Sequence, residues 1–355
     1  MCMKILAINP GSTSTKIALY EDKDLLFKES LEHSNEELAK YPSIASQYEM
    51  RKDAIISVLE KAGYSTKDLS AVVGRGGILP PVQSGAYVVN DVMADVLLNR
   101  PVLEHASNLG GLIAKDIADS VGVPAYIYDS VAVDELDDVA RLTGIKEIKR
   151  KSLSHALNMR ASAIKSAEKL GKPYNQTNQI VAHLGGGMSL SAHRQGRMLD
   201  IVSDDEGPFS PERSGRLPIK DFMKYALQFD LPTLTKKMRG GAGLVSLLGT
   251  NSALDVEKMI EQGDQQAKLV YDAMAYQIAK SIGELAVVLD GEVDAVVITG
   301  GIAYSKYITD YITKKVKFIA PVHVLPGENE LESLAHGAYR VLMGQEDAHE
   351  FVENR

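Results

Sequence analysis

Alternating apolar and polar positions predict a β-hairpin at the start of the chain. Residues 5–20, ILAINPGSTSTKIALY, contain an apolar strand, a turn rich in glycine and hydroxyl side chains, and a second, near-alternating strand. The turn is followed by a strand, and the chain contains no G-x-x-x-x-G-K-[ST] pattern, so a P-loop is a poor match. Small side chains let backbone N–H groups approach an anion. The turn is therefore either an ordinary hairpin or a phosphate site.

The same pattern recurs in the second half of the chain. Residues 178–193, NQIVAHLGGGMSLSAH, repeat the strand, glycine turn and strand, and an overlay of Ala7 on Ala182 places Ser14 on Ser189. Residues 71–77, AVVGRGG, likewise match residues 295–301, AVVITGG, and each of these segments follows a helical pattern. Two matches in the same order indicate two related α/β domains, each with a mixed sheet and helices packed against it.

The repeat predicts the domain organisation. We expect a first domain over 1–153 and a second over 154–330, with a C-terminal segment, 331–355, whose amphipathic helix packs on the first domain while its charged tail frays. Two facing domains leave a cleft, which is a common ligand site. In that cleft, the hairpin turns at Asn9–Lys16 and Gly185–Ser191 could hold a polyphosphate from both sides. Proline and glycine predict a loop over 204–218 that lines it.

Composition narrows the class of protein. The 355 residues are 45% apolar and 24% charged, as in soluble globular proteins, and the net charge of −8 argues against a nucleic-acid or anionic-membrane partner. Cys2 is the single cysteine, so an internal disulfide cannot form. No apolar run approaches the ~20 residues that span a bilayer. A strand beginning by Lys4 leaves no room for a signal peptide. We expect a cytoplasmic protein.

Seven segments together resemble the acetate and butyrate kinase family of the sugar kinase, Hsp70 and actin superfamily. The segments are NPGSTSTK at 9–16, GRGG at 74–77, DSVAVDE at 129–135, SLSHALNMR at 152–160, HLGGGMSLSA at 183–192, ERSGRLP at 212–218 and ITGGIAYS at 298–305. The resemblance covers nearly the whole chain. It implies two duplicated ribonuclease H-like domains with a nucleotide cleft between them. It also implies reversible transfer of a phosphoryl group between ATP and a short-chain carboxylate, with Mg²⁺, giving ADP and an acyl phosphate.

Four residues are candidates for the chemistry. Arg75 and Arg213 stand beside glycines, where a guanidinium fork can reach phosphate or carboxylate, although a surface ion pair is the common fate of an arginine. Asp129 follows the apolar strand PAYIY and is either a cleft carboxylate or a helix cap. His155 falls in the first turn of a helix predicted over 155–170 and capped by Ser152 or Ser154. The resemblance assigns catalytic roles to all four and a magnesium contact to Asp129.

The resemblance also assigns the nucleotide and metal contacts. The cofactor-binding candidates are Asn9, Ser12, Ser14, Lys16, His183, Gly185, Gly186, Gly187, Gly300 and Gly301. Gly186 stands where acetate kinases have asparagine, so one side-chain donor is lost and backbone N–H groups must bind the phosphate there. The Gly-Gly step at 300–301 would let adenine or ribose lie flat on the backbone. Glu330 is the second metal candidate, with Glu328 and Glu332 near enough to compete, because Mg²⁺ needs only one or two carboxylates.

The resemblance favours butyrate or a branched relative as the acceptor. Specificity among short acids should be soft, since one methylene in an apolar pocket changes binding by only ~1–3 kcal/mol. An acetate or propionate kinase remains an alternative, as does a hydroxyl-acceptor, sugar-type kinase, which would need a carboxylate base. A non-catalytic chaperone or filament protein of the same fold would need no arginine pair. A carboxylate is already a nucleophile at neutral pH, and no activated Ser, Cys or Asp is evident beside a base, so we expect direct in-line transfer. We also expect a homodimer or higher homo-oligomer.

Overall fold

The computed structural model describes residues 2–353, which form two compact units. The first unit holds the chain up to Asp134 together with the segment from Asn329 onward, and the second unit holds Glu135–Glu328. The unit boundary thus lies before the predicted position at 153. Arg150 explains the difference, because its Nη1 donates to Asp200 Oδ1 of the second unit at 2.9 Å and its Nε to Glu206 at 3.1 Å.

The first unit is built on a seven-stranded sheet in the order β12-β5-β6-β4-β1-β2-β3. Its strands are β1 (Lys4–Pro10), β2 (Ser14–Glu21), β3 (Asp24–Glu32), β4 (Ala71–Arg75), β5 (Ala86–Val88), β6 (Ala125–Tyr128) and β12 (His349–Glu350). Its helices are α1 (Asn35–Leu38), α2 (Tyr48–Lys61), α3 (Asp91–Asn99), α4 (Asn108–Val121) and α12 (Glu330–Leu342), with 3₁₀ turns η1 (Ala45–Gln47) and η2 (Thr66–Asp68).

The second unit is built on a five-stranded sheet in the order β11-β10-β7-β8-β9. Its strands are β7 (Asn178–Leu184), β8 (Met188–Arg194), β9 (Arg197–Val202), β10 (Ala295–Gly300) and β11 (Val322–Pro326). Its helices are α5 (Ala156–Lys169), α6 (Ile219–Ala226), α7 (Leu231–Met238), α8 (Gly243–Leu248), α9 (Ala253–Glu261), α10 (Gln265–Val288) and α11 (Lys306–Val316). The 3₁₀ turns are η3 (Asp138–Arg141), η4 (Tyr174–Gln176) and η5 (Gly301–Tyr304).

The predicted α/β duplication is confirmed by the strand order. In the first unit β3-β2-β1-β4-β6 run in the order and directions of β9-β8-β7-β10-β11 in the second. Each unit pairs an antiparallel hairpin with parallel strands on its other side. One detail of the overlay is wrong. Ser189 pairs with His183 inside its hairpin, whereas Ser14 lies beyond the last β1–β2 pair, Pro10 with Thr15, so the two serines are not equivalent.

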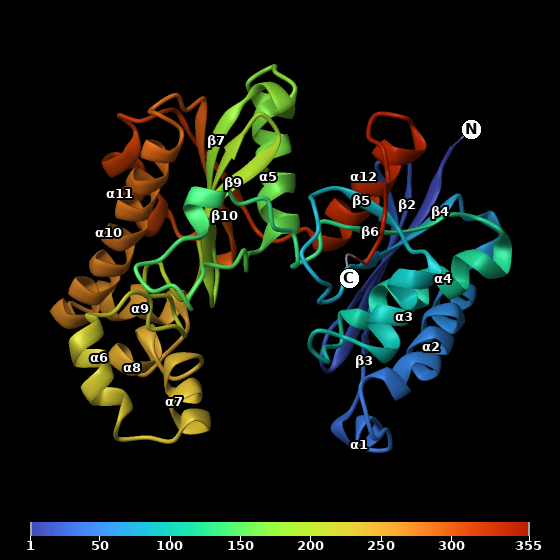
Figure 1. Ribbon diagram of the computed structural model, residues 1–355, viewed down its shortest axis with the longest axis horizontal. Coiled ribbons are helices and arrows are strands. Elements are labelled where there is room, and N and C mark those ends of the chain that lie inside the picture. The colour runs from blue at the N-terminus through green and yellow to red at the C-terminus, as the bar shows by residue number, and fades with distance from the viewer. Residues whose placement is uncertain (1, 354–355) are drawn as a thin grey trace. The chain divides into compact units, whose positions relative to one another are not determined.

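The central strands of both sheets are buried on their two faces. Residues 5–8 of β1 are fully buried, as are Ile180, Val181 and Ala182 of β7, which explains their continuous apolar runs. In the first unit α2, α3 and α4 cover one face and α12 the other; in the second, α5 lies on one face and α10 with α11 on the other (Figure 1). Among residues 2–353, no helix combines the length and apolar character needed to cross a bilayer.

The C-terminal segment packs on the first unit. Helix α12 contacts β1, β4 and β6, and Gly337 lets it approach the ring of Tyr128, whose atoms lie 2.5 Å from where a Cβ would stand. The prediction of a frayed tail is wrong up to residue 353. Strand β12 pairs with β5, Phe351 is buried, and Glu346 accepts a hydrogen bond from Tyr128 Oη at 2.7 Å. These contacts join the tail to residues that are distant in the sequence, so the local pattern of the tail could not predict them.

Candidate active site

The turn between β1 and β2 presents small, exposed side chains. Gly11 N donates to Ser14 O at 2.7 Å and closes the turn, while Ser12, Thr13 and Lys16 are exposed. Register places Asn9 opposite Lys16 at the mouth of the hairpin. All of the predicted contacts of this hairpin therefore lie at one end of the sheet.

Arg75 and Glu330 meet beside this hairpin, although 255 positions separate them in the chain. Arg75, the last residue of β4, donates from Nη1 to Glu330 Oε1 at 2.6 Å, and Asn9 Nδ2 donates to Glu330 Oε2 at 2.5 Å. A predicted catalytic arginine, a predicted metal ligand and a predicted phosphate contact thus form one cluster. The carboxylate of Glu330 neutralises Arg75 in the absence of an anionic ligand.

A cavity of about 390 Å³ opens over this cluster. It is lined by Asn9, Pro10, Gly11, Ser14, Lys16, Arg75, Ile78, His105, Ser107, Val131 and Glu330. Two cationic side chains, backbone of a glycine turn and two apolar side chains suit an anion with a short apolar chain.

Sequence reasoning missed three residues of the first unit. His105 and Ser107 line the cavity and bond to each other, Nδ1 to Oγ, at 2.8 Å. Their position just before a glycine-containing helix could have pointed to them. Arg51 of α2 lies fully buried beneath the β1–β2 turn and donates to Gly11 O at 2.9 Å. Its helical segment gave no signal, because an arginine on a helix is normally exposed.

Asp129 follows β6, as predicted, with a positive φ of 41°. Its side chain is 1% exposed, and Oδ1 accepts a hydrogen bond from Gly85 N at 2.7 Å. Its own N–H donates to Gly85 O at 3.1 Å. Such strained backbone is concentrated at functional sites. Asp129 is not among the residues that line the cavity, so its catalytic and metal roles stay predictions.

His155 and His183 stack in the second unit, with ring centroids 4.0 Å apart. Helix α5 spans 156–169, close to the predicted 155–170, but its N-cap is His155, so the expected serine cap is wrong. His155 Nδ1 lies 2.8 Å from Ser189 Oγ. The partly buried ring thus anchors the helix start to β8.

His183 is held in one orientation by its two neighbours. Asn158 Nδ2 lies 2.7 Å from His183 Nδ1 and fixes that side of the ring. Nε2 lies 3.0 Å from Glu328 Oε1, out of line for a hydrogen bond. Glu328, one of the competing acidic residues, therefore sits at the Gly185–Gly187 turn, as Glu330 sits at the first hairpin.

Gly300 requires its glycine. It ends β10 with φ +89°, and a Cβ there would lie 2.4 Å from Leu184 O. This backbone contact brings the end of β10 against the end of β7, next to the triple glycine. A Cβ on Gly301 would meet no atom within 4 Å, so open space adjoins that residue. The predicted adenine or ribose contact there stays a prediction.

Arg213 lies in the predicted loop and pairs with Asp204. Its Nε donates to Asp204 Oδ2 at 3.3 Å, and Arg239 Nη2 donates to the same oxygen at 2.6 Å. A Cβ on Gly187 would lie 3.6 Å from Asp204 Oδ2 and 4.0 Å from Arg213 Nε. The structure thus brings Arg213 to the turn of the second hairpin.

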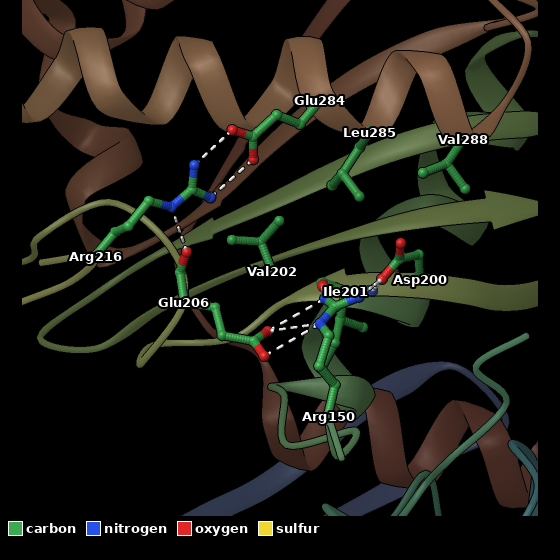
Figure 2. Close-up of a pocket in the computed structure, with 9 residues that line it drawn as sticks. All are labelled: Arg150, Asp200, Ile201, Val202, Glu206, Arg216, Glu284, Leu285 and Val288. Carbon is green, nitrogen blue, oxygen red and sulfur yellow. Dashed lines mark hydrogen bonds and ion pairs between the residues drawn. The ribbon is translucent and has the colours of Figure 1, made fainter. Parts of the chain in front are cut away.

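Arg216, three residues after Arg213, forms an ion pair with a helix and does not lie at the glycine turn. Figure 2 shows its guanidinium bound to both oxygens of Glu284 on α10, at 2.6 and 2.9 Å, while its Nε donates to Glu206 O at 2.9 Å. Hydrogen bonds from Arg216 hold the pKa of the Glu284 carboxyl below its ordinary value. The Glu206 carboxylate bonds to Arg150 (Figure 2), so the loop that carries Arg213 is fixed at its base.

Within residues 2–353, no group of three or more His, Cys, Asp or Glu side chains is arranged to hold a metal ion. A magnesium ion that is bound mainly by phosphates and water needs only one or two carboxylates. Glu330 offers hard oxygen donors at the cavity, which suits such an ion. The metal sites at Asp129 and Glu330 stay predictions.

Two repeated sheets of the same strand order agree with the actin-like ATPase fold. The acetokinase family model matches residues 140–336. Butyrate kinase 2 of Clostridium acetobutylicum is 49% identical over 355 residues, covering 99% of this chain and all of the relative. The chain belongs to the acetokinase family, and it is a carboxylate kinase, which implies the use of ATP.

Solved structures agree on the fold. Acetate kinase of Porphyromonas gingivalis superposes with a TM-score of 0.78 at 20% identity, covering 96% of this chain and all of the other. Acetate kinase of Entamoeba histolytica gives 0.76 at 17% identity, with the same coverage. At these identities the likeness concerns the fold alone.

Proposed function

We propose that this carboxylate kinase is a butyrate kinase, which phosphorylates butyrate or a branched relative from ATP, reversibly, to an acyl phosphate. The observation that carries the proposal is the 49% identity to a butyrate kinase over the whole length of both chains. The cavity of the first unit supports it, because Ile78 and Val131 add apolar surface beside Arg75. One methylene changes binding only modestly, so neighbouring acids should also react.

The arginines would counter the repulsion between two anions. Arg75 would release Glu330 and bind the carboxylate or the phosphoryl group in its place. Arg213 would likewise release Asp204 and bind one of these ligand groups. Each arginine is already held in a defined orientation, which lowers the cost of binding. His155, at the start of α5, would donate a hydrogen bond to the moving phosphoryl group.

The nucleotide contacts follow from the two hairpins. In this proposal Asn9, Ser12, Ser14 and Lys16 bind phosphate oxygens, with His183 and Gly185–Gly187 in the second unit. Gly300 and Gly301 would lie against the adenosine. Asp129 and Glu330 would hold Mg²⁺, which neutralises charge on phosphate oxygens when bound. Glu330 suits this role, whereas Asp129 is 1% exposed and already accepts a hydrogen bond from Gly85 N at Oδ1.

A coupled assay with a panel of acids tests the proposal. Acetate, propionate, butyrate, isobutyrate, isovalerate and valerate would each be supplied with ATP, and the acyl phosphate trapped as its hydroxamate. We expect the highest kcat/KM with butyrate or a branched four- or five-carbon acid. A higher kcat/KM with acetate or propionate would show that the protein is an acetate or propionate kinase. Activity only with sugars would overturn the proposal. Glucose and glycerol serve as the hydroxyl-acceptor controls.

A homo-oligomer in the cytoplasm is part of the same proposal. Large exposed apolar side chains on one stretch of the second unit, Leu217, Ile219, Met223, Leu227 and Leu231, support self-association. Light scattering coupled to size exclusion would give the mass in solution. A mass equal to the 38.5 kDa of one chain at micromolar concentration would contradict it.

A further inference from the structure

Arg51 is the unusual residue of the first unit, because it is a fully buried arginine. All three of its nitrogens donate hydrogen bonds to groups of the hairpin turn or to a side chain of η1. The acceptors are Gly11 O (2.9 Å), Ser12 O (3.0 Å), Ser14 O (3.2 Å), Thr15 Oγ1 (3.0 Å) and Gln47 Oε1 (2.9 Å). Arg51 thus binds the inner side of the turn from below.

None of these acceptors in the described chain is a carboxylate. Two other poorly exposed arginines do have a carboxylate partner: Arg75 pairs with Glu330, and Arg340 pairs with Glu346. The acidic residue that acts on Arg51 from a distance is Glu37, a half-exposed side chain of α1 whose Oε2 lies 3.8 Å from His33 Nδ1. Burying a cation without a nearby counter-ion is costly, and burial lowers the pKa of the Arg51 guanidinium.

The bonds to Arg51 also decide where the amides of the turn point. In a planar trans peptide the C=O and the following N–H point in opposite directions. Because Gly11 O and Ser12 O face Arg51, the N–H groups of Ser12 and Thr13 face away from it. Both residues are exposed, and neither N–H makes a hydrogen bond within residues 2–353. Two adjacent free amides form a concave anion site.

We propose that Arg51 is the buried counter-charge of a phosphate group that binds the N–H groups of Ser12 and Thr13. The protein leaves a positive charge beneath the turn, and the ligand completes the ion pair from above. This inference rests on the proposed function for its ligand, a phosphorylated substrate or product. It adds to that function the residue that orients the turn and attracts the anion, which acts as a positioning residue.

The substitution Gln47→Glu tests the counter-charge directly. Gln47 Oε1 accepts from Nε at 3.2 Å and from Nη2 at 2.9 Å, so glutamate would keep the geometry and add a carboxylate partner. We expect the affinity for inorganic phosphate, measured by calorimetry, to fall about tenfold, a typical size for one charge interaction near a protein surface. The melting temperature should stay equal or rise, because Arg51 gains a partner.

Lys52→Gln is the matched control. It removes one positive charge from the next position of α2, where Lys52 Nζ pairs with Glu49 and Asp116, both at 2.7 Å. We expect its phosphate affinity to remain within twofold of the unchanged protein. Arg51→Lys, which keeps the charge but loses the fork, should weaken phosphate binding less than Arg51→Met.

Amide chemical shifts locate the phosphate. Titration of the full chain with inorganic phosphate should move the amide resonances of Ser12 and Thr13, and Gln47→Glu should shift the same titration to higher phosphate concentration. Unchanged phosphate affinity in Gln47→Glu, or no response of these amides, would overturn the role of Arg51. Absence of kinase activity with every acid would instead refute the proposed function, since the phosphate titration does not depend on catalysis.

Discussion

Arg213→Ala should lower kcat with little effect on folding. Transfer from ATP to a carboxylate brings two anions together, so an arginine that binds both does most in the transition state. Loss of one such donor typically lowers the rate by ~10²–10³, or roughly 3–4 kcal/mol. Because the guanidinium acts mainly in the transition state, we expect the dissociation constant of ATP to change little.

The structure allows the folding cost of Arg213→Ala to be worked out. The Arg213–Asp204 pair, at 3.3 Å, joins side chains that are 23% and 16% exposed, and partly solvated pairs of this kind contribute ~1 kcal/mol or less. Asp204 keeps its 2.6 Å bond to Arg239, so no buried carboxylate is left alone. The melting temperature should therefore fall by only about 2–4 °C.

Steady-state kinetics with butyrate and ATP, together with ATP calorimetry and thermal unfolding, provide the assay. Arg213→Lys should recover part of the rate, because it keeps the charge and loses the fork. Arg239→Ala is the control, since it removes a bond to the same Asp204 oxygen while leaving Arg213 in place. Near-normal turnover in a folded Arg213→Ala protein would refute the catalytic role of Arg213.

Three further predictions concern the fold and the reaction path. Gly300→Ala should destabilise the protein by about 2–4 kcal/mol, because its Cβ would meet Leu184 O at 2.4 Å at a φ of +89°, whereas Gly301→Ala, with no atom within 4 Å, should unfold almost as the unchanged protein does. Burial lowers the pKa of His193 to about 3, so between pH 6.5 and 3 the unfolded chain binds a proton that the folded chain does not. The free energy of unfolding, measured by urea titration, should therefore fall by about 2 kcal/mol from pH 7 to pH 5. A His193→Gln protein whose free energy of unfolding falls just as much over this pH range would contradict the prediction. The carboxylate acceptor is already ionised at neutral pH, so transfer should be direct, and a ³²P-labelled enzyme that forms and decays at the catalytic rate would argue for a phosphoenzyme instead.

The local pattern of the sequence determined the elements and their duplication. Apolar runs and glycine turns identified the strands at 4–10 and 178–184, because short apolar runs and tight turns depend on neighbouring residues alone. The helix at 156–169 was predicted to within one residue at each end. Matching segments in the same order were enough to predict two related sheets, and the strand orders agree.

Only the tertiary structure decided which side chains meet. Arg75 and Glu330 are 255 residues apart, and their contact depends on α12 returning to the first sheet. Arg51 sits on an ordinary helical segment, and its burial beneath the hairpin turn follows from how α2 packs. Arg213 and Arg216 look alike in sequence, yet one bonds Asp204 near the glycine turn and the other Glu284 on α10. Such pairings are set by the topology of the folded chain, which a local pattern does not encode.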